Sequence, residues 1–210
     1  MDFNGDHTST CTAHPGATKT HDWMVSALGP LFRTAGHTVR TQCGVTASAG
    51  QRRGDGEIRN YLRDQAGSRS LVFDLSITHD RYGSSSHPLQ NGRLTYPQDI
   101  DAPLHIAAQR KTNTYRQEYA QNQNISFLPA ITSTSTRMHG EFLRLLFLQA
   151  HRETEAHFTA TGVPSQRNQS DSFRFKRAAF FQSLKSKVEL AAAKAAALLL
   201  SHNLPFPRVH

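Results

Sequence analysis

The feature that most constrains the fold is the run SLVFDLSIT at residues 70–78. Large apolar residues stand at every second position and Val72 adds an apolar side chain to the other side. The run therefore predicts a strand in the interior of a sheet. Asp74 lies in the middle of this run. An ionised group in an apolar strand is costly without a partner, so Asp74 is either a functional residue, the interpretation we favour, or a buried carboxylate capped by neighbouring groups.

The segments around this strand predict an α/β fold with one mixed sheet. Helical spacing of apolar residues and runs rich in Val, Ile and Thr occur in the order helix, three strands, helix, strand, helix, followed by one more helix. Gly29 and Pro30 are expected to kink or split the first helix. The predicted strands are 38–47, 57–62, 70–78 and 125–132, and the predicted helices begin at His21, at Pro103 after a cap at Asp101, at Ser135 or Thr136, and at about Phe173.

The chain has 210 residues, a length that suits one domain with peripheral segments. The polar stretch 1–20 has no periodicity and predicts a disordered tail, and 21–160 is predicted to hold the α/β domain. A linker at 161–172, a basic and then alanine-rich helix at 173–202, and a tail at 203–210 complete the expected organisation.

The charge of the chain favours a polyanionic partner. Lysine and arginine outnumber aspartate and glutamate by 24 to 16, which gives a formal net charge of +8. Nucleic acid, DNA before RNA, is the expected partner because a basic surface attracts phosphates before any specific contact forms. A basic balance also serves plain solubility, so charge alone does not decide the function.

Cysteine usage and hydropathy indicate the compartment. Cys11 and Cys43 form neither a CxxC pair nor a dense framework, so no disulfide scaffold is expected. No apolar segment of the kind found in secretory signals occurs near the start. The most apolar run, 191–200, is too short to span a bilayer and contains Lys194. We expect an intracellular protein, with the nucleus as its compartment, and no membrane partner.

Two acidic residues and a lysine are candidates for phosphodiester chemistry. Metal-dependent hydrolysis needs carboxylates that hold a divalent cation and a lysine that orients water or offsets charge. Asp55 lies just ahead of the second strand, in RRGDGEI, so a hairpin would bring it to Asp74, with Glu57 as a spare ligand. The sequence RGDG is also typical of an ordinary turn, and taken alone it favours the turn over a functional role for Asp55.

Lys111 is the candidate lysine. The helix predicted after Pro103 has its apolar stripe at Leu104, Ala108, Tyr115 and Tyr119, and Lys111 falls on that stripe. A solvated lysine would lie on the opposite side. The alternative is a lysine at the edge of the core whose long stem reaches solvent.

Basic residues occur near the candidate acids and on the last predicted helix. Arg52 and Arg53 adjoin Asp55, and Arg69 precedes the third strand, so phosphates are expected at the edge that holds the carboxylates. Lys176 and Arg177 on the last helix are further candidates for nucleic-acid contacts. Exposed arginines at turns are more often plainly solvated. We favour packing on the domain for the phenylalanines of that helix, Phe173, Phe175, Phe180 and Phe181.

Four short segments carry a resemblance to a known family. RRGDGEI, LVFDLSITH, AAQRKTNTY and ISFLPAI are similar to the restriction-endonuclease-like domain, of the PD-(D/E)XK superfamily, that follows the reverse transcriptase in some non-LTR retroelement proteins. The resemblance implies an αβββαβα core and a metal-dependent DNA endonuclease. It implies that Asp55 and Asp74 are the first and second acids and bind Mg²⁺ or Mn²⁺. It also implies a fragment of a longer protein, because no polymerase segment accompanies the domain.

The sequence departs from the family pattern at two places. Ser76 stands where the family has a lysine, so Lys111 would have to replace that lysine. The alternatives are therefore a catalytically inactive nucleic-acid-binding module, or a relic or interaction protein, with the same fold. His7 and Cys11 match half of a zinc-knuckle-like region that precedes the domain in the family, and we expect no stable zinc because structural zinc needs four ligands, even if His14 or His21 helps.

Overall fold

A computed structural model of the chain describes residues 16–33, 37–41, 54–64, 67–82, 87–120, 122, 124–162 and 170–203. Within these residues the predicted order of elements is confirmed. The elements are the helices α2 (Gly16–Arg33), α3 (Ala102–Ala120), α4 (Gly140–Ala160) and α5 (Asp171–Asn203), the short 3-10 helix η1 (Pro88–Gln90), and the strands β1 (Val39–Thr41), β2 (Gly56–Asp64), β3 (Gly67–Thr78) and β4 (Ile125–Ser133).

The four strands form one mixed sheet in the order β1-β2-β3-β4. The pairs β1/β2 and β2/β3 are antiparallel, and β3/β4 is parallel. A parallel pair needs a crossover connection, which α3 provides between β3 and β4. β3 therefore lies between two partners, and the predicted mixed sheet with an interior third strand is confirmed.

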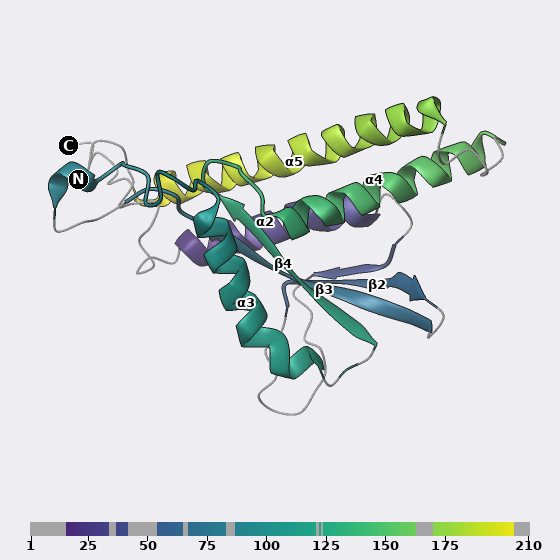
Figure 1. The fold of residues 1–210 in the computed structure, drawn as a ribbon, viewed down its shortest axis with the longest axis horizontal. Helices are drawn as coiled ribbons and strands as arrows, with labels where there is room; N and C mark the ends of the chain where they lie inside the picture. Colours follow the sequence, from purple (N-terminus) through teal and green to yellow (C-terminus); the bar gives the residue numbers. More distant parts are fainter. Residues whose placement is uncertain are drawn as a thin grey trace, which may run out of the picture.

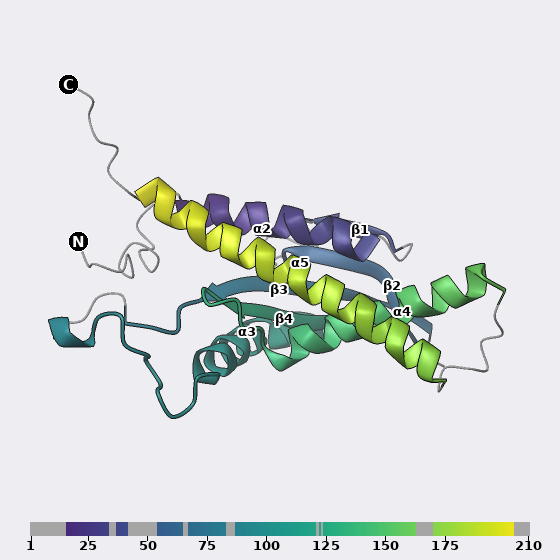
Figure 2. The ribbon, with the colours of Figure 1, turned by 90° about the horizontal axis from the view of Figure 1, so that it is seen from above.

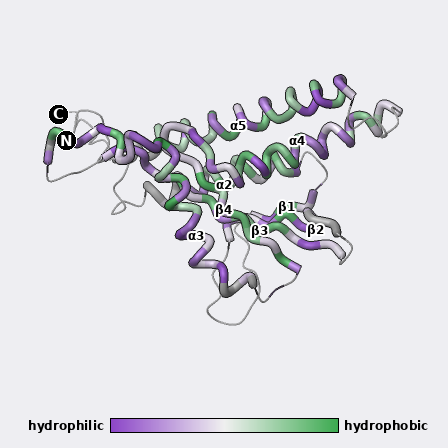
Figure 3. The backbone as a smooth tube through the Cα atoms, in the orientation of Figure 1, coloured by the Kyte–Doolittle hydropathy of each residue, from purple (hydrophilic) through white to green (hydrophobic). Residues whose placement is uncertain are grey.

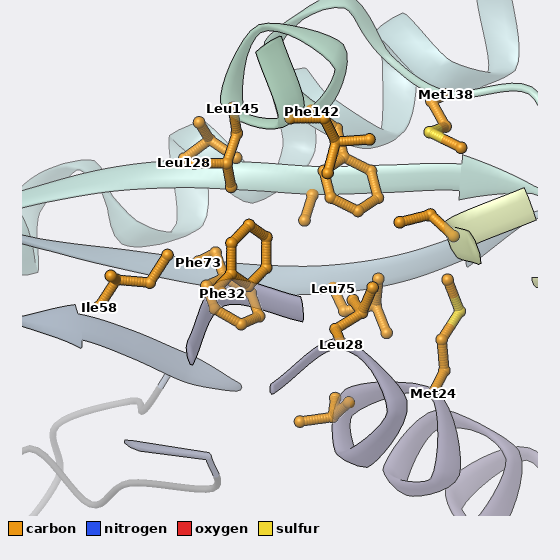
Figure 4. Packing of buried hydrophobic residues seen from close by; sticks show 14 of the residues in the cluster. Met24, Leu28, Phe32, Ile58, Phe73, Leu75, Leu128, Met138, Phe142 and Leu145 are labelled. Atoms are coloured by element: carbon orange, nitrogen blue, oxygen red, sulfur yellow. The ribbon is translucent and has the colours of Figure 1, made fainter. Parts of the chain in front are cut away.

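The main core lies on one face of this sheet. Figures 1 and 2 show α2, α4 and α5 together over that face, with α3 on the other side. Figure 4 shows side chains from α2 and α4 meeting side chains of the strands. The labelled members of this cluster, all buried, are Met24, Leu28, Phe32, Ile58, Phe73, Leu75, Leu128, Met138, Phe142 and Leu145.

The second face of the sheet carries a smaller apolar cluster under α3. Leu104, Ala107 and Ala108 of α3 pack on Ile131 of β4. After Ala108 the sequence of α3 is mainly hydrophilic, QRKTNTYRQE, and Figure 3 shows much of α3 in purple and pale colours. The sheet thus has one face built for apolar packing and one face that mixes apolar and polar groups.

The first helix differs from its prediction at both ends. It begins at Gly16, so it includes residues 16–20, which the sequence places in a tail. Thr20 is buried in this first part of α2. Because threonine is polar, the periodicity of apolar residues did not predict that the helix extends this far. Pro30 lies inside α2, which is one uninterrupted helix up to Arg33. A proline so close to the end removes little of the hydrogen-bond ladder, which explains why the helix is not split. The expected C-cap, Gly36, lies outside the described residues.

The strand β4 and the helix α4 are joined by a turn that the sequence analysis did not predict. α4 begins at Gly140 with His139 as N-cap, so the prediction of a start at Ser135 or Thr136 is wrong. Ser135 Oγ instead donates a hydrogen bond to Asp80, and Thr136 has a positive φ of 67°, which is incompatible with a helix start. The first strand is short, and the predicted strand positions from 42 to 47 lie outside the described residues.

The last helix belongs to the same core as the sheet. Val188, Ala192 and Ala195 of α5 are members of the main apolar cluster, and Phe173 is also buried, whereas Phe175 is 79% exposed. The expectation that the phenylalanines of this helix pack therefore holds for Phe173 and is wrong for Phe175. Across the described stretches of chain, every helix is too short or too polar to cross a membrane.

Candidate carboxylate and lysine site

Asp74 lies at the centre of β3 on the face that α3 covers. Its neighbours Phe73 and Leu75 belong to the main core on the opposite face, as alternation along a strand requires. Asp74 is only 3% exposed. A carboxylate removed from water to this extent needs hydrogen-bonded or charged partners to remain ionised.

The inner side of α3 supplies two of those partners. Lys111 Nζ forms an ion pair with Asp74 Oδ2, and the hydroxyl of Tyr115 donates a hydrogen bond to Asp74 Oδ1 at 3.0 Å. The two residues are four apart, so they occupy adjacent turns of one helix face. The predicted position of Lys111 on the inner stripe, beside a carboxylate, is confirmed, while its catalytic role stays a prediction.

Asp55 approaches Asp74 from the neighbouring strand. Gly56 is in register with Phe73, so the antiparallel pairing carries the preceding Asp55 to the level of Asp74. Asp55 Oδ2 accepts a hydrogen bond from the backbone N–H of Leu75 at 2.6 Å. The hairpin therefore brings the two acids together, as the sequence predicts.

The glycines that flank Asp55 allow this close approach. A Cβ at Gly56 would lie 2.2 Å from the ring of Phe73, and one at Gly54 would lie 2.3 Å from Val72 Cγ1 and 2.9 Å from the carbonyl oxygen of Phe73. Neither glycine has a positive φ. The two glycines of the motif GDG therefore allow close packing of β2 on β3, whereas the functional role of Asp55 stays a prediction.

His21 of α2 is a further member of the site. Its Nε2 lies 3.0 Å from Asp55 Oδ2, and its side chain is 33% exposed. The hydrogen bond to Asp55 raises the pKa of His21 to about 9 against the opposing effect of burial, and the charges of Asp55 and Asp22 add to the increase. His21 is therefore protonated at neutral pH and carries a positive charge next to Asp55.

The electrostatics of the site centre on Asp74. Burial raises the pKa of Asp74 above the usual value, and the nearby charge of Asp55 raises it further. Hydrogen bonds from Lys111 and Tyr115 and the charge of Lys111 act in the opposite direction without cancelling the increase. Burial, followed by the charge of Asp74, raises the pKa of the Tyr115 hydroxyl, which keeps it a hydrogen-bond donor. The carboxylates of Asp55 and Asp74 repel each other. The positive charges of His21 and Lys111 lie beside them.

Glu57 and Ser76 lie on the same sheet face but outside this cluster. Glu57 is in register with Val72, and its carboxylate lies 3.8 Å from Arg59. Glu57, the predicted spare metal ligand, therefore has Arg59 as its charged neighbour. Among the described residues, no group of three or more His, Cys, Asp or Glu side chains is arranged to hold a metal ion. Ser76 lies in register with Ile131 of β4.

Of the basic residues predicted to bind nucleic acid, the three that the structure describes lie away from the carboxylates: Arg69, Lys176 and Arg177. Arg69 is in register with Leu62, and strand alternation places it on the face opposite Asp74, so its predicted position beside the acids is wrong. Lys176 and Arg177 lie on α5, in the layer over the other face, where they contact the rings of Phe180 and Phe147. Arg52 and Arg53 lie outside the described residues, as do the zinc-site candidates His7, Cys11 and His14.

Asp80 is a second buried aspartate, two residues after the end of β3, and its pKa shifts in the opposite direction to that of Asp74. Asp80 Oδ2 accepts hydrogen bonds from Ser135 Oγ at 2.5 Å and from Arg137 Nη2 at 3.3 Å. Burial would raise the pKa of Asp80, but these hydrogen bonds and the charge of Arg137 outweigh it and lower the pKa. Arg137 also pairs with Asp101 at 2.8 Å, so the predicted capping side chain of Asp101 is engaged by an arginine.

Two site residues were not predicted from the sequence. Tyr115 lies on the predicted apolar stripe four residues after Lys111, so the spacing already contained a signal for its position. His21 stands 34 residues before Asp55, and no local pattern connects the two. Comparison of the chain with protein-family models, with curated proteins and with solved structures gave no match.

Proposed function

We propose that the chain is a metal-dependent DNA endonuclease-like domain with a restriction-endonuclease-like core. The observation that carries this proposal is the convergence of Asp55 from β2, Asp74 from β3 and Lys111 from α3 at one largely buried point. Acids on adjacent antiparallel strands beside a lysine are the groups that phosphodiester hydrolysis requires. Retroelement origin remains part of the proposal and rests on the sequence resemblance.

The two carboxylates fit a divalent cation. Mg²⁺ and Mn²⁺ prefer oxygen ligands, and Mg²⁺ is commonly held by one or two carboxylates together with water and substrate phosphate. The raised pKa of Asp74 reflects burial first and the nearby charge of Asp55 second, and the charge of a bound cation would oppose both effects. Asp55 and Asp74 would hold the ion, which when bound polarises the phosphate and lowers the pKa of a water.

The other groups have roles that follow from their contacts. The ammonium of Lys111 can offset the negative charge that grows on the phosphate during attack by water. Tyr115 holds Oδ1 of Asp74 by its hydrogen bond and so fixes the orientation of the carboxylate. His21 and the Leu75 N–H fix Asp55 in the same way. Water adds to phosphorus as one P–O bond breaks, leaving a phosphate end and a hydroxyl end.

A second candidate function is nucleic-acid binding without catalysis. Each acid is already engaged, Asp74 by Lys111 and Tyr115 and Asp55 by His21 and Leu75 N–H. A cation bound by both carboxylates would compete with the charges of Lys111 and His21. This internal neutralisation, together with Ser76 at the position of the usual lysine, is the observation that supports a binding module as the second candidate.

Nicking of supercoiled plasmid DNA distinguishes these candidates. The nuclease proposal expects relaxed plasmid with Mg²⁺ or Mn²⁺ and none with EDTA. Asp74→Asn and Lys111→Met should each abolish the metal-dependent nicking, since the first removes a ligand and the second removes the ammonium while keeping an apolar stem.

Ser76→Ala is the matched control for this experiment. It changes the same face of β3 two residues away and should leave nicking close to the wild-type rate. Nicking that persists in EDTA, or in Asp74→Asn, contradicts the proposed site. Plasmid binding without nicking in every metal supports the binding module.

A further inference from the structure

The outward face of α3 differs in chemistry from the inner face that contacts Asp74. The inner face carries Leu104, Ala108, Lys111 and Tyr115 against the sheet. With about 3.6 residues per turn, the opposite ridge carries positions 106, 109 and 113, with 110 and 116 on its two flanks. All five of these outward positions are solvent-exposed: Ile106, Gln109, Arg110, Asn113 and Arg116.

The outward ridge is ordered and cationic. Gln109 Nε2 donates a hydrogen bond to Asn113 Oδ1 at 2.9 Å, so the two amides are aligned along the helix. Arg110 and Arg116 lie on either side of them. No aspartate or glutamate occurs from position 105 to position 117, so no carboxylate of this segment repels a polyanion.

The position of α3 leaves this ridge accessible. α3 packs on β4 and β3, and Figures 1 and 2 show it alone on its side of the sheet, apart from α2, α4 and α5. Four of the exposed residues also line an open hollow in the surface, together with His105 and Thr114: Ile106, Gln109, Arg110 and Asn113. Among the described residues, no other helix covers the outward ridge.

We propose that α3 is a recognition helix that enters the major groove of duplex DNA. Gln109 and Asn113 would contact base edges, because an amide side chain can form two hydrogen bonds with adenine at N6 and N7. Ile106, which is 52% exposed, would lie against a thymine methyl group. Arg110 and Arg116 would bind phosphates on the two sides of the groove. This inference rests on the proposed function and names the element that selects the substrate.

Helix dimensions favour duplex DNA over duplex RNA as the occupant. An α-helix with its side chains is about 10–12 Å across, and the major groove of B-form DNA is about 12 Å wide. The major groove of A-form RNA is deep and narrow and does not admit such a helix. The face therefore fits DNA, and it predicts a preference for sites that contain A·T pairs.

The same helix joins recognition to the carboxylate site. Lys111 and Tyr115 are within two turns of Gln109 and lie on the reverse side of α3. Only the width of one helix separates the proposed base contacts from Asp74. A rigid element that carries both sets of groups would fix which phosphates stand near the carboxylates once the bases are bound.

Selection from a pool of random-sequence duplex DNA, followed by fluorescence anisotropy, tests this inference. The wild-type chain should enrich a motif with A·T pairs. Gln109→Ala/Asn113→Ala should bind the enriched duplex about 10-fold or more weakly, while its affinity for random duplex stays the same. Alanine favours helix formation, so the variant keeps its fold. Arg116→Ala should weaken binding to all sequences equally and reduce the slope of affinity against salt concentration by about one.

Gln182→Ala/Ser186→Ala is the matched control, because it removes two exposed polar side chains four residues apart on α5. It should leave both affinity and preference unchanged. Wild-type binding without any sequence preference, or an equal preference in Gln109→Ala/Asn113→Ala, overturns the recognition helix and leaves the proposed nuclease intact. Equal binding of duplex RNA with the same dependence on Gln109 and Asn113 also overturns it. Absence of any binding at low salt overturns both proposals.

Discussion

The two faces of β3 serve different purposes. Phe73 points into a cluster formed with α2, α4 and α5 and is 1% exposed. Its neighbour Asp74 points toward α3 and is almost as deeply buried, at 3%. The first face therefore contributes apolar packing, whereas the second places a carboxylate among two cations and a second acid. The contrast teaches that one strand can supply both the stability of the fold and a costly polar site.

The sizes of the two apolar clusters explain how the fold tolerates the buried carboxylate of Asp74. Three helices cover the first face, and their buried residues form one continuous core with the sheet. The second cluster contains four residues, Leu104, Ala107, Ala108 and Ile131. Because stability is concentrated on the first face, substitutions on the second can change charge without unfolding the chain.

Phe73→Ala should have the largest effect on stability. Removing a buried aromatic side chain leaves a cavity under α2 and the sheet, and such changes cost about 3–5 kcal/mol. The ring also contacts Phe32, with centroids 5.8 Å apart. Urea denaturation followed by circular dichroism measures the loss of unfolding free energy. Phe175→Ala is the control, since that ring is 79% exposed and should change little. Equal losses in the two variants would contradict the assignment of the core.

Asp80→Asn should have the next largest effect, about 2 kcal/mol, because it weakens charge-assisted hydrogen bonds to Ser135 and Arg137 in a buried position. The lowered pKa of Asp80 gives the sign of the pH dependence. Its contribution is present above the ordinary aspartate pKa of 3.8 and is lost as the pH falls through the lower folded-state value.

Urea denaturation of wild type and Asp80→Asn at neutral and acidic pH checks this. The difference between them should shrink on acidification. A variant as stable as wild type at neutral pH would show that the end of β3 does not depend on this charge.

The sequence was sufficient for features that depend on local periodicity. The alternation around Asp74 predicted an interior strand, and the helical stripe that contains Lys111 placed the lysine beside the acid. Both patterns repeat within a few residues, so neighbouring positions reinforce one another. The approach of Asp55 was also predictable, because a hairpin connects adjacent strands in register.

Features that depend on tertiary contacts were not predictable in this way. His21 reaches Asp55 only because α2 packs across the sheet. The helix α4 begins at Gly140 and not at Ser135. The Ser135 side chain is instead bound to Asp80, a residue 55 positions earlier. Arg69 was expected beside the acids, but the alternation of β3 directs it to the other face. A polar residue in a loop can cap a helix, form a turn or bind a distant group, and the tertiary partner decides which of these occurs.

The His21–Asp55 pair should give a smaller, pH-dependent effect of about 1 kcal/mol, since a side chain that is one third exposed is partly screened by solvent. Folding raises the pKa of His21 from 6.5 to about 9. The stabilisation is therefore fully present below 6.5 and is lost as the pH rises through about 9. His21→Gln should lack this loss.

Unfolding free energies of wild type and His21→Gln at about pH 6 and about pH 10 provide the measurement. Comparison with the variant cancels the titration of other groups. The same pH dependence in both proteins would mean that His21 does not gain its proton affinity from Asp55.

Asp74→Asn should have the smallest effect on stability, within about 1 kcal/mol, despite the burial of the residue. The raised pKa of Asp74 means that folding makes ionisation of this carboxyl less favourable, and asparagine avoids that cost because it is neutral at every pH. Its side-chain oxygen can still accept the hydrogen bond from Tyr115, and Lys111, 24% exposed, can turn its ammonium toward water. A raised pKa contributes stability below 3.8 that is lost as the pH rises, so any gain of the variant over wild type should fade toward acid. Thermal melts with and without Mg²⁺ test this, and Mg²⁺ should stabilise wild type alone. A metal-independent loss of several kcal/mol in Asp74→Asn would identify Asp74 as the anchor of Lys111, and the proposed metal site would have to be withdrawn.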